Sequence, residues 1–197
     1  MFQWQFEIIN TLIVKMGKGK TAKHRSGRAL RVEPSHHDIF EIYPEIGEKF
    51  RKAGWMPFIR TLNDYHPQMA MAFAQTFNGF QAQVGGLTMY ISEGTIAETF
   101  KLDIIGDRWF KKGKIDETLL NQFLPPGHQN PDWSKGIPLS SLLKEWRMVL
   151  FLVKKYISCE GRYSLIFRYH MNFLLHMTGD TETNLPFFIL KSLKRCP

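Results

Sequence analysis

The chain has 197 residues, of which 44% are hydrophobic, so it is long enough to bury the core of one globular domain. Its net charge of +8 comes mainly from positions 15 to 31, where seven basic residues lie without an acidic one. Two cysteines, Cys159 and Cys196, are too few for a disulfide framework and favour an intracellular location. No apolar run reaches the roughly 20 residues of a membrane-spanning helix, so we expect no membrane contact.

The chain divides into two regions near position 36. Residues 1–14 form a short apolar segment that can be helical, and residues 15–36 are rich in Gly, Lys and Arg without a hydrophobic period. Such a composition is typical of a flexible basic arm. Because the periodic pattern starts near His37, we predict an apolar segment and arm over 1–36 and a helical globular domain over 37–197.

The sequence predicts short helices in the first part of this domain. Pro44 and Pro57 interrupt the helical pattern, because proline lacks the N–H that a helix interior requires. Gly54 suits the position that follows the C-terminus of a helix. Residues 63–77 then predict an amphipathic helix, with apolar residues recurring on one face.

A β-hairpin is the strongest strand signal in the sequence. Apolar and polar residues alternate on both sides of Gly85-Gly86, and two glycines suit a tight turn that needs positive φ angles. We therefore expect a hairpin over 80–91. Ser92 can cap a short helix over 93–102.

The second half of the domain predicts four helices and a loop. A short helix over 115–124 precedes a Pro- and Gly-rich loop over 125–138. Apolar residues then recur at steps of three and four over 139–157, which predicts a helix of about five turns. Further helices are expected over 163–178, ending at Gly179, and from Leu185-Pro186 onwards.

The expected fold class is α+β and predominantly α-helical, with six to eight helices around a small two-stranded hairpin in a single domain. The apolar positions of the last three helices predict one shared core. We place in it Trp146, Val149, Leu150, Val153, Phe167, Phe173, Leu174, Phe188 and Ile189.

No spacing in the sequence assigns a catalytic residue, so catalytic residues stay unknown, and we predict no metal ion and no cofactor. His170 and His176 lie six residues apart, whereas a helical zinc pair needs a spacing of four, so we expect both to be packed or hydrogen-bonded. A two-metal nuclease needs converging carboxylates. Most of the candidate acids are better explained as helix caps and turns, and these acids are Asp38, Asp64, Asp103, Asp107 and Asp116.

The basic arm is the main candidate for a functional segment. Its cations can contact nucleic-acid phosphates, serve as a nuclear localisation signal, or form a solvated tail. The candidate DNA- or RNA-binding residues are Lys15, Lys18, Lys20, Lys23, Arg25, Arg28 and Arg31.

Several motifs in the domain occur in an order that resembles a known family. The stretch from Gly54 to Leu102 begins with Gly-Trp, continues through a helix ending in a Phe-rich segment, and contains the Val84-Gly85-Gly86 turn. A Trp-containing helix follows, and then "FRYHMNFLLHMTGDTETNLPFFILKSL" with its Asn-Leu-Pro. In this order and spacing, residues 47–193 resemble the plant transposon protein domain, which occurs in plant retroelement-associated reading frames.

That resemblance implies a mobile-element origin but carries no catalytic residues. We therefore expect a non-catalytic domain with a binding or assembly role, with sequence-blind nucleic-acid contact through the arm. Two alternatives stay open. One is a transposase- or integrase-related enzyme whose acidic residues converge in the fold, and the other is a non-functional retroelement remnant.

Overall fold

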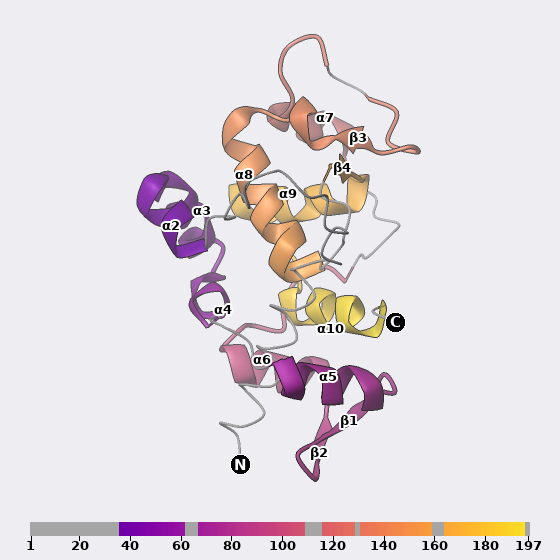
Figure 1. Ribbon diagram of the computed structural model, residues 1–197. Coiled ribbons are helices and arrows are strands. Elements are labelled where there is room, and N and C mark those ends of the chain that lie inside the picture. The colour runs from indigo at the N-terminus through magenta and orange to yellow at the C-terminus, as the bar shows by residue number, and fades with distance from the viewer. Residues whose placement is uncertain (1–35, 62–66, 109–115, 129–130, 159–163, 196–197) are drawn as a thin grey trace, which may run out of the picture.

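The computed structural model describes residues 36–61, 67–108, 116–128, 131–158 and 164–195, and Figure 1 shows their arrangement. The described residues form nine α-helices, one more than the upper limit expected from the sequence, and two small antiparallel strand pairs. The predicted class, α+β and predominantly helical, is confirmed. The basic arm lies outside the described residues.

Three short helices open the domain: α2 (His36–Ile42), α3 (Pro44–Lys52) and α4 (Met56–Arg60). Both α3 and α4 have a proline in their first turn, where a missing N–H leaves no helical hydrogen bond unmade. Gly54 follows the C-cap of α3 with a φ of 71°, so its predicted role is confirmed.

The predicted hairpin is present after α5 (Pro67–Thr76). Strands β1 (Gln81–Val84) and β2 (Leu87–Tyr90) pair antiparallel, and Gly85 and Gly86 adopt φ angles of 58° and 78° in the turn. The hydroxyl of Thr76 accepts from the N–H of Gln83 and donates to its carbonyl, at 2.9 Å each. The end of α5 therefore satisfies backbone groups of β1.

Side-chain caps begin the next two helices. The hydroxyl of Ser92 accepts from Thr95 N–H at 3.0 Å at the start of α6 (Glu93–Phe100), which confirms the predicted cap. Asp116 accepts from Thr118 N–H at 2.9 Å before α7 (Glu117–Leu120), and the 3₁₀ helix η1 (Asn121–Phe123) follows directly.

The single helix expected over 139–157 is divided into three elements. The 3₁₀ helix η2 (Leu139–Ser141) is followed by α8 (Lys144–Val153) and the π-helix η3 (Lys154–Ser158). The backbone is extended at Leu142 and Leu143, because Leu143 N–H donates to Phe123 carbonyl at 2.9 Å instead of continuing the first turn. A tertiary hydrogen bond thus delays the start of α8 to Lys144.

The helix expected over 163–178 was also predicted too long. Strand β4 (Leu165–Ile166) and the 3₁₀ helix η4 (Arg168–His170) precede α9 (Met171–Thr178). Here β4 pairs with β3 (Ile137–Pro138), a second strand pair that the sequence did not indicate. A side chain on Gly136 would come within 2.9 Å of the Ile166 carbonyl, so this approach needs a glycine.

The predicted core is confirmed for eight of its nine residues, which have at most 7% of their surface exposed. Phe167 was placed there wrongly, because it precedes η4 and is only half-buried, with its ring stacked on Tyr169. Trp146 packs edge-on against Phe123, with ring centroids 4.9 Å apart. Helices α8 and α9 lie at the centre of the molecule, with the β1–β2 hairpin at one end (Figure 1).

The turn between α9 and α10 (Leu185–Arg195) is tied to distant parts of the chain. The predicted helix start at Leu185-Pro186 is confirmed, and the side-chain oxygen of Asn184 accepts from Phe187 N–H at 2.9 Å and so caps α10. Its amide donates to Glu93 at 2.7 Å, and Arg108 contacts the same carboxylate oxygen at 2.9 Å. Asn184 is 1% exposed, so this turn joins the start of α6 to the start of α10.

We predict that Trp146→Ala lowers the free energy of unfolding by about 3–5 kcal/mol, because it leaves a cavity beside Phe123. Denaturant melting measures the change. Glu98→Ala, at an exposed position on α6, is the control and should change stability by less than about 0.5 kcal/mol. A loss below about 1 kcal/mol for Trp146→Ala would show that this ring does not support the core.

Asn184→Ala should cost about 2 kcal/mol, because it removes a helix cap and a hydrogen bond to a carboxylate. Asn184→Asp keeps the capping oxygen but places a second carboxylate against Glu93. It should therefore be destabilised at neutral pH and recover below about pH 4, where carboxylates become protonated. Urea melts at both pH values test this, and wild-type stability of Asn184→Asp at pH 7 would contradict it.

Candidate functional site

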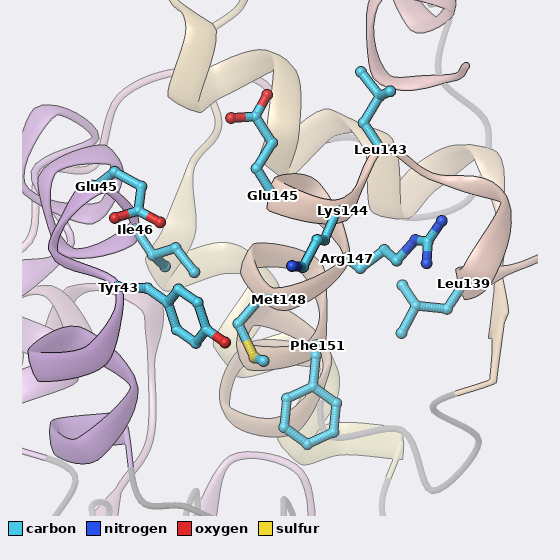
Figure 2. Close-up of a pocket in the computed structure, with 10 residues that line it drawn as sticks. All are labelled: Tyr43, Glu45, Ile46, Leu139, Leu143, Lys144, Glu145, Arg147, Met148 and Phe151. Carbon is cyan, nitrogen blue, oxygen red and sulfur yellow. The ribbon is translucent and has the colours of Figure 1, made fainter. Parts of the chain in front are cut away.

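An open cleft of about 810 Å³ lies between the start of α3 and one side of α8. The lining side chains come from three places: the α2–α3 junction with the first turn of α3, η2, and α8 with the residue that precedes it. Figure 2 shows these residues, which are Tyr43, Glu45, Ile46, Leu139, Leu143, Lys144, Glu145, Arg147, Met148 and Phe151.

Most of the cleft wall is apolar. Ile46 is 2% exposed and forms a buried part of the wall, while Leu139, Leu143, Met148 and Phe151 are half-buried and pack against the core. Tyr43 is half-buried too, and in Figure 2 its ring reaches from the α3 side toward Met148. These side chains present apolar surface that is still accessible to a ligand or a partner chain.

The charged side chains of the cleft stand at its rim. Glu45, Lys144, Glu145 and Arg147 are all exposed, and they contribute two positive and two negative charges. Arg147 donates from Nε to the Leu142 carbonyl at 2.6 Å, which holds its guanidinium against the wall. The rim is therefore nearly balanced in charge, so apolar contact dominates what the cleft can recognise.

One set of contacts fixes the spacing of the two helices at the cleft. The ammonium of Lys49 lies 4.0 Å from the centroid of the Trp146 ring and 3.9 Å from the Glu145 carboxylate. A cation over an indole face is an attractive contact of about 0.5–1 kcal/mol at partly exposed sites. Lys49 thus bridges α3 to α8 beside the opening.

The sequence did not identify this cleft. Tyr43 was not assigned to any face, and Met148 and Phe151 lie outside the predicted apolar stripe of 139–157. A signal was nevertheless present, because α8 carries more apolar residues than one core-facing stripe needs. The candidate arm residues, from Lys15 to Arg31, lie outside the described residues, so the structure does not place them.

His170, His176 and Asp116 have structural roles in the fold. His176 is hydrogen-bonded at both ring nitrogens, to Ala53 carbonyl and Thr183 N–H at 3.0 Å each, and His170 Nδ1 accepts from Phe167 N–H at 2.9 Å. Hydrogen bonds from Thr118 hold the pKa of the Asp116 carboxyl below its ordinary value. Among the described residues, no group of three or more His, Cys, Asp or Glu side chains is placed to hold a metal ion.

A fully buried lysine follows α8. Lys154 begins the π-helix η3, and its ammonium donates to the Leu165 carbonyl, which ties η3 to β4. A π-helix often marks a functional position, but this lysine lies in the core rather than in the cleft. We therefore assign Lys154 a role in holding β4 against the end of α8.

Comparison of the chain with protein-family models, curated proteins and solved structures finds no match. The resemblance of residues 47–193 to the plant transposon protein domain thus stays a prediction. Within the described part of the chain, no helix is long and apolar enough to span a membrane.

Proposed function

We propose that the chain is a mobile-element-derived, non-catalytic domain with a binding role, and that the α3–α8 cleft holds an apolar segment of its partner. The observation that carries the proposal is the open apolar wall from Ile46 to Phe151. Its volume of about 810 Å³ lies within the range of about 300–1,000 Å³ typical of ligand sites.

The arrangement of polar groups supports binding over catalysis. Catalysis needs a nucleophile or base held against a reacting atom inside a site, whereas the charged groups of this cleft are exposed at the rim. The alternative of a transposase-related enzyme requires converging carboxylates, and no such cluster supports it among the described residues. The mobile-element origin rests on the sequence resemblance.

We predict that an apolar fluorescent dye, anilinonaphthalene sulfonate, binds the folded full-length chain at this cleft. Met148→Asp should weaken binding by about tenfold or more, because it places a carboxylate in the apolar wall. Fluorescence titration measures the affinity. Met71→Asp is the matched control, since Met71 is 52% exposed on α5 and does not line the cleft.

Circular dichroism melting of both variants separates loss of binding from loss of folding. If Met148→Asp proves unfolded, Phe151→Ala removes apolar wall without adding a charge and repeats the test. Equal dye affinity of wild type and the folded cleft variant would contradict a binding role for the cleft.

Sequence-blind nucleic-acid contact through the arm is a second proposed activity. Seven cations lie between Lys15 and Arg31 without an acid, while the rest of the chain has 19 basic and 18 acidic residues. Phosphate contacts give affinity without reading bases, and the arm has no aromatic side chain for stacking. A basic segment of this kind also suits a nuclear address, so we propose a nuclear location.

We predict that duplex DNA binding, measured by fluorescence anisotropy, falls steeply with salt. If about four to seven arm cations contact phosphates, log affinity should fall with log salt at a slope of about 4–6. Replacing all seven with Gln should abolish the salt-dependent part. Replacing Lys191, Lys194 and Arg195 at the end of α10 is the control, and binding lost only with that control would move the contact into the domain.

A further inference from the structure

The outer edge of β1 in the hairpin is closed by side chains of the same domain. The outward backbone groups of β1 belong to Gln81 and Gln83. Asn78 accepts from Gln81 N–H at 3.0 Å with its side chain and donates its own N–H to the Gln81 carbonyl at 3.1 Å. Thr76 does the same for Gln83 through its hydroxyl. No backbone group of this edge is therefore left for a further strand.

The outer edge of β2 is open. Ile91 N–H donates to the Phe80 carbonyl at 2.7 Å, so this pair is hydrogen-bonded and the next pair, Gln81 with Tyr90, is not. By the same alternation, the N–H and carbonyl groups of Thr88 and Tyr90 point away from β1. Within the described part of the chain, no group is hydrogen-bonded to them.

The β2 edge also lacks the features that keep edge strands apart. Proteins commonly protect such an edge with a charged side chain, a proline or a β-bulge. The register of β2 with β1 is regular, and residues 67–92 contain no Asp, Glu, Lys or Arg. Leu87 and Tyr90 on β2 are 48% and 67% exposed. An uncharged edge with exposed apolar side chains favours the addition of another strand.

We propose that two copies of the chain pair through this edge, with β2 of one copy antiparallel to β2 of the other. The outward groups of Thr88 and Tyr90 lie symmetrically on either side of Met89, so a two-fold axis at Met89 matches all of them. Thr88 then lies opposite the partner's Tyr90, and each of the two pairs exchanges two backbone hydrogen bonds. The two hairpins together form one four-stranded sheet.

Charge and side-chain chemistry favour a second copy as the occupant. Each chain has a net charge of +8, so two copies repel each other wherever their basic residues meet. Residues 67–92 bring no charge to the contact. On the exposed side of the sheet, each Tyr90 ring lies beside the partner's Thr88. Aromatic and β-branched side chains in such cross-strand pairs stabilise the pairing.

The contact is small and separate from the α3–α8 cleft. A strand of four residues places it at the low end of interface sizes, so we expect a transient dimer with a dissociation constant of the order of 10–100 μM. No residue of the hairpin lines the cleft, and the hairpin lies at one end of the molecule (Figure 1). The inference therefore adds an assembly surface to the proposed binding site.

Sedimentation velocity of the full chain between about 5 and 500 μM measures the association. Thr88→Lys with Tyr90→Lys places like charges opposite each other in both pairs, so it should raise the dissociation constant by about tenfold or more. Met71→Lys with Gln75→Lys adds the same charge at exposed positions of α5 and is the matched control. It should change the dissociation constant by less than about threefold.

Amide hydrogen exchange, followed by NMR, identifies the bonds themselves. In the unaltered chain, the amides of Thr88 and Tyr90 should exchange about fivefold more slowly at about 500 μM than at about 10 μM, because the dimer protects them. The Met89 amide is bonded to β1 in both states, so its exchange should not change with concentration. This measurement needs no substitution, so it decides the matter even if a variant fails to fold.

Three results would overturn the proposal. The first is a chain that stays monomeric up to about 500 μM. The second is a dimer that the folded Thr88→Lys, Tyr90→Lys variant forms as well as wild type, since its interface lies elsewhere. The third is protection of the two amides that does not depend on concentration, because another part of the same chain would then cover the edge. None of these results bears on ligand binding in the cleft.

Discussion

The imidazole of His176 joins the α9–α10 turn to the end of α3, 123 residues earlier in the chain. Its Nδ1 accepts from Thr183 N–H, so the ring hydrogen lies on Nε2 and is donated to the Ala53 carbonyl. The ring also stacks on Trp55 with centroids 4.9 Å apart and an interplanar angle of 5°. One neutral side chain thus forms a hydrogen bond with a backbone group of the α9–α10 turn and another with a backbone group at the end of α3. Both hydrogen bonds need this tautomer.

The position of α3 follows from that contact and determines the cleft. Trp55 also packs edge-on against Phe173, so the end of α3 is held against α9. Lys49, one turn earlier, meets Trp146 and Glu145 on α8. The first turn of α3 is therefore placed beside α8 without closing on it, and the gap between them is the cleft. Loss of the His176 contacts would change the cleft although His176 does not line it.

Local signals explain which parts of the fold the sequence could predict. The Gly85-Gly86 turn, the Ser92 cap and the helix start at Leu185 depend on residues within a few positions, and each is present as expected. The helix bounds that the sequence predicted wrongly depend on contacts between residues distant in the chain. The pairing of Ile137 with Ile166 and the hydrogen bond from Leu143 to Phe123 join residues about 20 to 30 positions apart. Each contact makes a helix shorter than the hydrophobic periodicity of the sequence predicted.

The cleft and the core lie on two sides of the same helix, α8. In α8, Trp146, Val149, Leu150 and Val153 face the core, while Met148 and Phe151 continue the apolar surface onto the cleft. A helix at the surface of a monomer needs an apolar stripe on one side only. The extra apolar width of α8 leaves apolar surface accessible at the cleft, and apolar surface of this kind is typical of a binding site. The apolar residues of this one helix therefore form part of the core and part of the cleft wall.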